Sequence, residues 1–369
     1  MSTQKTGVNM VSLEKVEQNY SETYKSIEQP PPDIVVFNEL RSCADLFRLY
    51  EKDQIDIRPY FQREGVWSVP DQTRFIDSLV KQLPIPSMCF AFDYKTRKWI
   101  VIDGLQRMTA IIKFLNEKDH WTLSRLEDID PKLSGKNSKE FHDEKSELYS
   151  YVERIENLTL PITVLRCDFT DETHMEYLFK IFHRLNAGGI RLNSQEIRNC
   201  IYSGPLNKLL IALDKEPKWT ELKSHINGKK DRFRSVELIL RILAFSKSRD
   251  TYKGNLARFL NDYMFNHRKE SEVELGKFKD AFIRMSTALV DKVIPAMEPR
   301  KFGFTQIEAL AIGVIVNLNN VESANNKKLQ KCIIKFQEIE LLSTEALSAD
   351  ISRTESVKNR LKFAIASFA

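Results

Sequence analysis

The residues with the clearest chemical potential lie in segment 100–107, Ile-Val-Ile-Asp-Gly-Leu-Gln-Arg. Its apolar start predicts a buried strand, and Gly104 predicts a sharp turn before a helix, because glycine permits a tight turn or a close approach of ligand to backbone. The first N–H groups of a helix carry partial positive charge and favour a bound anion. Arg107 can add a bidentate phosphate contact, Asp103 can hold a divalent cation beside the phosphate, and Gln106 can orient a ligand or water. The segment therefore predicts a phosphate site.

A simpler structural interpretation fits the same spacing. Asp103 would then only cap the helix, Gly104 would only form the turn, and Arg107 would belong to a surface ion pair. A strand followed by Asp-Gly is common turn chemistry, so spacing alone leaves both interpretations open.

Two further segments accompany the first. Residues 57–67, Ile-Arg-Pro-Tyr-Phe-Gln-Arg-Glu-Gly-Val-Trp, place Gln62 and Arg63 on a loop after a short strand. A third block consists of residues 182–189, Phe-His-Arg-Leu-Asn-Ala-Gly-Gly, and residues 192–198, Leu-Asn-Ser-Gln-Glu-Ile-Arg. Three motifs thus occur in order along the chain: I-x-P-x-[YF]-Q-R … W, D-G-x-Q-R and this third block. Their order argues against a chance arrangement.

With these motifs, residues 35–200 resemble the N-terminal, GmrS-like part of the GmrSD family of modification-dependent restriction endonucleases. The likeness extends more loosely through residues 231–241. The resemblance implies an α/β first domain similar to the ParB and sulfiredoxin fold. It also implies that this domain binds a nucleoside triphosphate, with Mg²⁺, and hydrolyses it to regulate or power DNA restriction against phage.

The resemblance also assigns roles to individual positions. Catalytic roles fall to Asp103, Gln106 and Arg107, nucleotide binding to Gln62, Arg63, Gly104 and Arg107, and Mg²⁺ binding to Asp103. Asn186 is a further candidate for nucleotide binding, and a helix C-cap and turn is the alternative interpretation of this residue. Leu105 stands where the family usually has Gln. If the family's Gln touches the nucleotide or a catalytic water, hydrolysis is weakened in this chain. If the position faces the core, Leu105 is harmless, and its apolar spacing with residues 108, 112 and 115 favours this second interpretation.

Several absent motifs narrow the function. Neither G-x-x-x-x-G-K-[ST] nor G-x-G-x-x-G occurs, which argues against P-loop and Rossmann nucleotide sites. The phosphate turn contains no Cys, unlike that of sulfiredoxin. Larger members of the family carry a histidine-metal nuclease domain after the helical region, but the six histidines of this chain form no pair at metal-ligand spacing. We therefore expect a separate GmrD-like subunit to cut the DNA.

Alternating apolar patterns predict the elements that position the motifs. Helices are expected at 40–51, 71–82, 105–116 and 172–185, and strands at 54–58, 88–94, 99–102 and 158–166, with a charged rim insertion at 118–154. Asn193 and Glu196 then form a capping box, and the rest of the chain is helical, for example at 236–245, 256–265, 278–293, 305–318 and 329–342. The predicted architecture is α+β overall and helix-rich. It comprises a flexible tail (1–32), a ParB/sulfiredoxin-like nucleotide-binding domain (33–200) and an α-helical domain (201–369).

Composition agrees with a globular chain of two domains, since 369 residues include 42% hydrophobic and 29% charged side chains. A net charge of +5 permits DNA contact without requiring it. The most basic segment is 223–234, where Lys229, Lys230, Arg232 and Arg234 are candidates for contact with DNA phosphates; a solvated surface loop is the alternative. Five widely spaced cysteines fit a reducing compartment and no apolar run has membrane length, so we expect a soluble, cytoplasmic protein.

Two hypotheses follow. In the first, the chain is an NTP-binding and NTP-hydrolysing subunit of a GmrSD-like restriction system, with DNA, including modified phage DNA, and a GmrD-like nuclease as partners. In the second, the pocket is a non-catalytic, nucleotide-gated switch that controls DNA binding or another interaction. The sequence leaves open the nucleotide, the DNA modification and the formation of a homo-oligomer.

Overall fold

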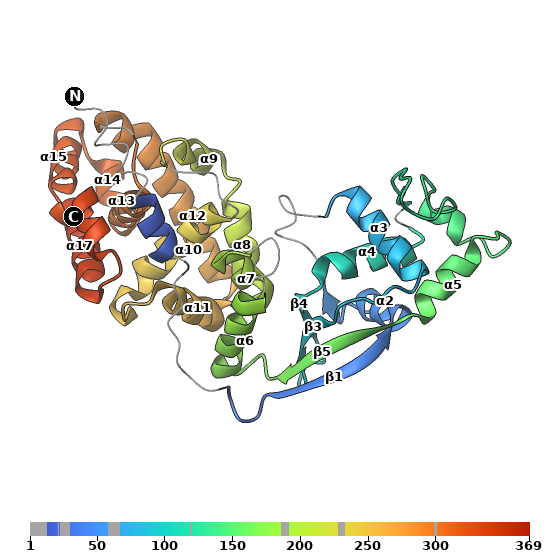
Figure 1. Cartoon of the computed structure of the whole chain (residues 1–369). Helices are drawn as coiled ribbons and strands as arrows, with labels where there is room; N and C mark the ends of the chain where they lie inside the picture. Colours follow the sequence, from blue (N-terminus) through green and yellow to red (C-terminus); the bar gives the residue numbers. More distant parts are fainter. Residues whose placement is uncertain are drawn as a thin grey trace. The chain divides into compact units, whose positions relative to one another are not determined.

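The computed structural model describes residues 13–20, 22, 30–57, 67–118, 120–185, 192–227, 233–298 and 301–369. The chain divides into two compact units (Figure 1). The sheet unit comprises residues 28–192, and the helical unit comprises residues 193–369 together with residues 1–27. The architecture is α+β overall and rich in helix, as the sequence predicts.

A mixed five-stranded sheet with strand order β1-β5-β3-β4-β2 organises the sheet unit. Its strands are β1 (Val35–Ser42), β2 (Ile55–Asp56), β3 (Met88–Asp93), β4 (Trp99–Asp103) and β5 (Thr159–Cys167). Strand β5 pairs antiparallel with β1 and parallel with β3, while β4 pairs antiparallel with β3 and parallel with β2. This order places β4, which leads into the predicted phosphate turn, inside the sheet.

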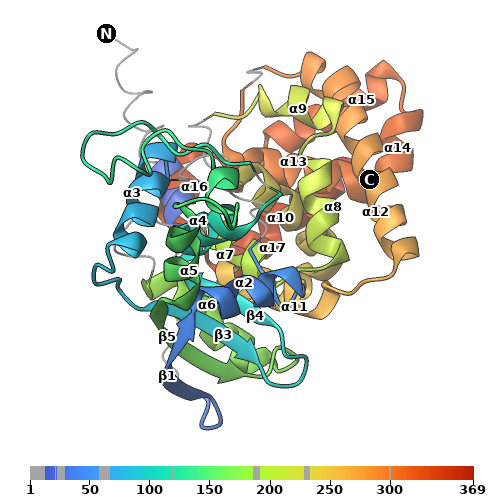
Figure 2. The same ribbon diagram turned by 90° about the vertical axis from the view of Figure 1, so that its right-hand side faces the viewer.

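The helices of the sheet unit are α2 (Cys43–Glu51), α3 (Val69–Val80), α4 (Leu105–Leu115), α5 (Tyr149–Asn157) and α6 (Glu172–Leu185). Helices α2 to α5 lie together beside the sheet (Figure 2), and helix α4 packs against both α2 and α3. Alternate strand residues such as Phe90 and Val164 fill the core beneath them. The segment 118–154, predicted as a charged rim insertion, also contributes to this core through the buried side chains of Leu133 and Phe141.

The start of the sheet unit differs from the sequence prediction. A helix is predicted over 40–51, but residues 40–42 belong to strand β1 and the helix begins at Cys43. Ser42 caps this helix by accepting a hydrogen bond from the Asp45 N–H at 3.1 Å. The side-chain cap fixes the boundary, because a Ser N-cap adopts the extended conformation that ends a strand.

The helical unit contains the remaining helices. They are α7 (Ser194–Ile201), α8 (Pro205–Leu213), α9 (Pro217–Lys223), α10 (Arg234–Ser248), α11 (Leu256–His267), α12 (Glu272–Ala288), α13 (Phe304–Val316), α14 (Leu318–Ser323), α15 (Asn326–Gln337), α16 (Thr344–Asp350) and α17 (Thr354–Ser367). Helix α13 is almost wholly buried and packs against α10, α12 and α17. The capping box predicted for Asn193 and Glu196 is confirmed, since each residue bonds the other's backbone N–H.

Part of the predicted tail is a structural element of the helical unit. Residues 13–20 are helical, and Leu13, Glu17 and Tyr20 are buried on one face. The Glu17 carboxylate accepts hydrogen bonds from the backbone N–H groups of Phe304 and Thr305, at 3.3 and 2.7 Å, where α13 begins. The prediction of a flexible tail is therefore wrong for this stretch. A single buried face of three residues is a weak signal within a polar segment.

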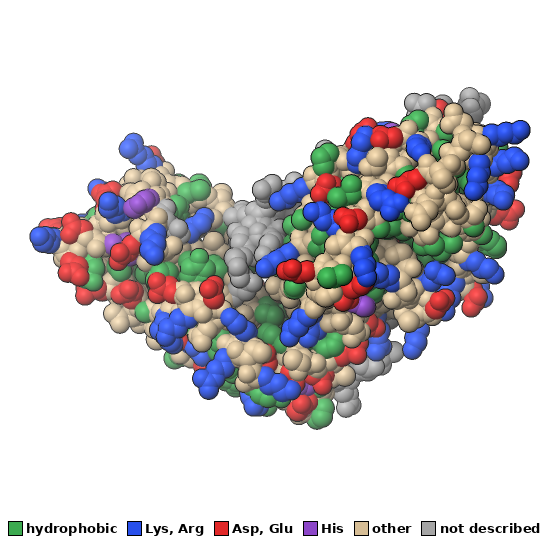
Figure 3. Space-filling view, turned by 180° about the vertical axis from the view of Figure 1, so that it is seen from behind, with side chains coloured by type: hydrophobic (Ala, Val, Ile, Leu, Met, Phe, Trp, Pro, Cys, Tyr) green, Lys and Arg blue, Asp and Glu red, His purple; other side chains and the backbone are tan. Residues whose placement is uncertain are grey.

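Charged side chains are interspersed over the surface. In the view of Figure 3, Lys and Arg side chains alternate with Asp and Glu on both units. Ion pairs of this kind occur throughout the described residues, for example between Arg74 and Asp128 at 2.7 Å. Among the described residues, no helix has the length and apolar character that crossing a membrane requires.

Candidate functional site

Gly104 joins β4 to α4 in the conformation that the predicted turn requires. Its φ of +97° is in the left-handed region, which residues with a Cβ rarely adopt. A Cβ at this position would also lie 2.6 Å from Cγ of Met88, whose side chain is fully buried in β3. The backbone conformation and the close passage of β3 both restrict this position to glycine.

Arg107 is held on the first turn of α4 by two acceptors. Its Nη2 donates to Oδ2 of Asp103 at 2.7 Å, and its Nη1 donates to the Pro86 carbonyl. The Arg107 side chain is only 13% exposed, whereas that of Asp103 is 46% exposed. The guanidinium is thus fixed in orientation next to the Gly104 turn, with an exposed carboxylate beside it.

Asp103 does not cap helix α4. Gly104 occupies the N-cap position, and no side chain among the described residues bonds the first N–H groups of the helix. The structural interpretation of the motif is therefore wrong for Asp103. The same interpretation correctly predicts that Arg107 forms an ion pair, although this pair is partly buried. The N-terminal end of α4 keeps the partial positive charge on which the predicted anion site depends.

Gln106 connects α4 to the segment that follows the Q-R motif. Its Oε1 accepts a hydrogen bond from the Trp67 backbone N–H at 3.3 Å. The Trp67 ring packs edge-on against Phe75, with 5.4 Å between ring centroids, and touches the core of the sheet unit. Gln106 and Phe75 therefore hold Trp67, the first described residue after the Q-R motif, beside the first turn of α4.

Leu105 and Cys89 form the apolar side of the turn. Leu105 is half-buried and packs against the hydrophobic core, as its apolar spacing predicts. Cys89 of β3 pairs in register with Asp103. Burial, together with the negative charge of Asp103, raises the pKa of the Cys89 thiol to about 12. Cys89 is therefore a neutral packing residue and not a nucleophile.

Of the remaining predicted site residues, the structure describes Arg234. Gln62, Arg63, Asn186, Lys229, Lys230 and Arg232 lie outside the described residues. Arg234 is described, and its guanidinium lies over the Phe304 ring, 4.7 Å from the centroid. Its Nη atoms are 3.9 and 3.8 Å from the carboxylates of Glu14 and Glu17. In this structure Arg234 thus faces the helical segment 13–20.

A buried ionic network in the helical unit was not predicted. Arg198 Nη1 lies 3.1 Å from Glu237 Oε2, Arg241 Nη2 lies 2.8 Å from Glu237 Oε1, and Arg241 Nη1 lies 3.0 Å from Glu308 Oε2. All four side chains are at most 5% exposed. Burial opposes the charge of Arg241, but Glu237 and Glu308 outweigh this effect and raise its pKa. The four-residue spacing of Glu237 and Arg241 within an apolar helix is the signal that could have revealed the network.

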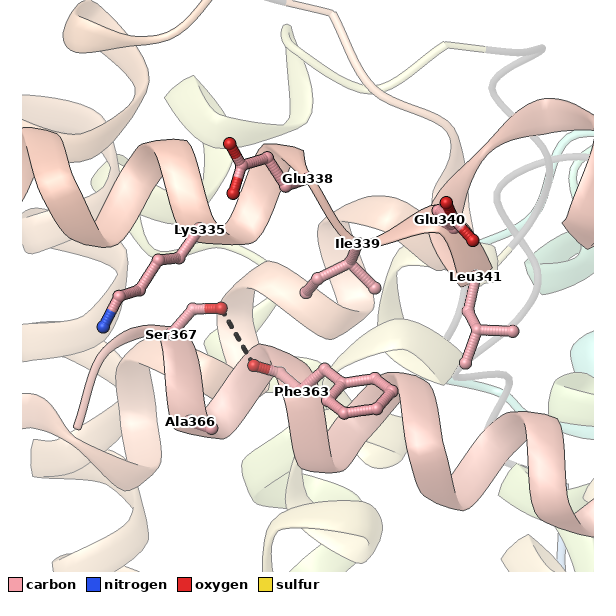
Figure 4. A pocket seen from close by; sticks show the side chains of 8 residues that line it. All are labelled: Lys335, Glu338, Ile339, Glu340, Leu341, Phe363, Ala366 and Ser367. Atoms are coloured by element: carbon pink, nitrogen blue, oxygen red, sulfur yellow. Dashed lines mark hydrogen bonds between the residues drawn. The ribbon is translucent and has the colours of Figure 1, made fainter.

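Two surface grooves are lined by residues outside the three motifs. One, of about 480 Å³, is lined by side chains of α15, of residues 338–341 and of α17, among them Lys335, Ile339 and Phe363 (Figure 4). The other, of about 520 Å³, lies beside α5 and is lined mainly by polar residues, including Glu153 and Arg154. None of the residues that the motifs single out lines either groove.

The described parts of the chain contain no group of three or more His, Cys, Asp or Glu side chains that could hold a metal ion. Asp103 offers one exposed carboxylate beside the Gly104 turn. This arrangement suits Mg²⁺, which commonly binds through one or two carboxylates together with substrate phosphates.

A comparison with protein families matches residues 44–203 to the family described as GmrSD restriction endonuclease, N-terminal domain. The matched range contains the D-G-x-Q-R turn and the Q-R motif, and it ends just after α7. No curated protein and no solved structure matches the chain. The family match confirms the resemblance inferred from the three motifs.

Proposed function

Because residues 44–203 are a GmrSD-type N-terminal domain, we propose that the protein is the nucleotide-dependent subunit of a GmrSD-like DNA restriction system. In this proposal the sheet unit has a ParB/sulfiredoxin-like fold and binds a nucleoside triphosphate at the turn between β4 and α4. Nucleotide binding and hydrolysis then regulate or power DNA cleavage, including cleavage of modified phage DNA, by a GmrD-like nuclease subunit.

The orientation of Arg107 is the observation that carries the proposal. A guanidinium has five N–H groups in one plane, and the bonds to Asp103 and Pro86 use two of them. These bonds set the plane in advance, so less side-chain entropy is lost when a phosphate binds. The phosphate would also meet the N–H groups at the start of α4, next to the Gly104 turn.

Asp103 has two roles in this proposal. Its bond to Arg107 orients the guanidinium, and its exposed carboxylate can contribute one ligand to Mg²⁺ that is held mainly by nucleotide phosphates. The metal would supply charge neutralisation for the transferred phosphoryl group. Gln106 positions the Trp67 end of the Q-R loop, and Gln62 and Arg63 would bring a second positive charge to the phosphates.

A non-catalytic switch is the second candidate, and it depends on the role of position 105. The Leu105 side chain packs against the core, which is the arrangement in which the substitution leaves hydrolysis intact. The family usually has Gln at this position. If that Gln takes part in hydrolysis, this chain binds nucleotide and changes its affinity for DNA or a partner without turnover.

Binding and turnover can be separated in one set of measurements. Titration calorimetry with ATP and GTP in the presence of Mg²⁺ reports binding, and a phosphate-release assay with and without DNA reports hydrolysis. We expect Arg107→Lys to weaken binding by about tenfold or more, since Lys cannot reproduce the planar fork. Asp103→Ala should reduce turnover more than binding.

Arg74→Lys is the matched control. Arg74 also forms an ion pair in the sheet unit, with Asp128, but it lies on the surface of α3. This variant should bind and hydrolyse nucleotide like the wild type. Binding without turnover in the wild type favours the switch, and an absence of nucleotide binding refutes both candidates. Unchanged affinity in Arg107→Lys removes Arg107 from the site.

A further inference from the structure

Strand β1 is an open edge of the sheet. Among the described residues it pairs only with β5, and it lies at the outer side of the sheet in both views (Figures 1 and 2). Four of its eight residues are large apolar side chains that face solvent: Val35 is 46% exposed, Val36 56%, Phe37 38% and Leu40 70%. This is an unusual concentration of apolar surface on one strand.

The register identifies the backbone groups that face outward. The Cys43 N–H donates to the Leu158 carbonyl at 3.0 Å, in line with the β1–β5 register. Hydrogen-bonded and non-hydrogen-bonded positions alternate along an antiparallel pair, so odd-numbered residues of β1 bond β5. The N–H and C=O groups of Val36, Asn38 and Leu40 consequently point to the open edge.

This edge lacks the usual protection against pairing. Natural edge strands are blunted by Lys, Pro, bulges or very short length. Residues 35–42 contain neither Lys nor Pro, and their register with β5 is continuous over eight pairs. The two charged residues neutralise each other, because Arg41 Nε lies 2.5 Å from Glu39 Oε1. The strand therefore presents a neutral, apolar pairing edge.

We propose that β1 pairs antiparallel with β1 of a second copy of this chain, about a twofold axis at Asn38. The outward residues are symmetric about this point, with one aliphatic residue on each side of Asn38. Val36 would lie opposite Leu40 of the second copy, and Asn38 opposite its own equivalent. The three outward residues of each copy then form six backbone hydrogen bonds, and the exposed aliphatic side chains cover one another.

The strand length excludes a register centred on Leu40. A twofold axis at Leu40 would place Val36 opposite residue 44, which lies in helix α2 and cannot extend the ladder. The axis at Asn38 keeps residues 35–41 of both copies within the strand. A continuous ten-stranded sheet across the dimer is the result.

The mass of the protein in solution tests the proposal. Sedimentation velocity over a wide concentration range should show a dimer of the full-length wild type. Leu40→Lys places a charge at the edge, and Leu40→Pro removes an outward N–H without disturbing the bonds to β5; both should shift the protein to monomer. Val273→Lys is the control, because Val273 is 68% exposed on α12 and should leave the dimer intact.

Cysteine substitution tests the register. Opposed residues of a hydrogen-bonded pair have Cα atoms about 5.5 Å apart, which permits a disulfide. Under oxidation, Asn38→Cys should form a covalent dimer, whereas Val36→Cys and Leu40→Cys alone should not, and the double variant should. Circular dichroism of each variant checks that the fold is kept. A monomeric wild type, a dimer that persists in both Leu40 variants, or a disulfide through Leu40→Cys in place of Asn38→Cys overturns the proposal.

Discussion

Replacement of Gly104 by alanine is the most direct test of the geometry on which the phosphate turn depends. At a φ of +97°, a residue with a Cβ costs about 1–2 kcal/mol relative to glycine. The added Cβ would lie 2.6 Å from Cγ and 2.9 Å from Sδ of Met88. Met88 is fully buried, so its side chain cannot move aside into solvent. Overpacking of such a core typically costs about 1–3 kcal/mol. Gly104→Ala should therefore lower the free energy of unfolding of the sheet unit by about 2–5 kcal/mol.

Gly135→Ala separates the two contributions. Gly135 also has a left-handed backbone, with a φ of +74°, and lies in the same unit. Its added Cβ would meet Arg125, but this exposed side chain can swing into solvent. We expect a loss of only about 1–2 kcal/mol, from the backbone alone.

Urea unfolding followed by tryptophan fluorescence measures both variants, since Trp67, Trp99 and Trp121 lie in the sheet unit and only Trp219 lies in the helical unit. If Gly104→Ala is no less stable than Gly135→Ala, the close contact with Met88 does not restrict the turn. The geometric argument for Gly104 would then fail.

Two further predictions concern the charged residues outside the turn. Burial acts to raise the pKa of Asp168, but hydrogen bonds from Lys95 and Thr170 outweigh burial and lower the pKa to about 2. The bonds stabilise the fold above the unfolded-state pKa of about 4, and this stability is lost as the pH falls from about 4 to 2. When the free energy of unfolding is measured over this pH range, it should therefore fall less steeply in Asp168→Asn than in the wild type. Equal slopes would contradict the assignment. Glu17→Ala removes the side chain that caps α13 at Thr305 and should destabilise the helical unit by about 1–2 kcal/mol, with a smaller effect for Glu17→Gln. Thermal unfolding measures this difference, and equal melting temperatures for Glu17→Ala and wild type would show that the cap is dispensable.

Sequence patterns predicted the elements around the turn because local chemistry determines them. The apolar run 99–102 and the glycine at 104 locate β4 and the start of α4 to within a residue. Asn193 and Glu196 set the start of α7 through a reciprocal cap that needs no tertiary contact. Where side-chain and backbone groups bond within a few residues, periodicity and capping rules were sufficient.

The sequence failed where tertiary partners decide the structure. Leu40 fits a helical apolar pattern with the residues of α2, but pairing with β5 draws it into β1. Glu17 lies in a polar segment, and its partner at Thr305 is 288 residues away. No window of local sequence contains either interaction, so propensity alone predicted the commoner local outcome.

The third motif block shows the same limit for function. Its spacing relative to the D-G-x-Q-R turn supports the family resemblance, yet Arg198 lies in the helical unit and pairs with Glu237. An arginine in a recurring motif can contact a ligand or complete a buried ionic network, and both roles require the same side chain at the same position. Burial distinguishes the two arginines, because the Arg107 side chain is 13% exposed whereas the Arg198 side chain has no exposed surface. The D-G-x-Q-R turn therefore carries the proposed nucleotide site, whereas Arg198 of the third block belongs to the buried ionic network of the helical unit.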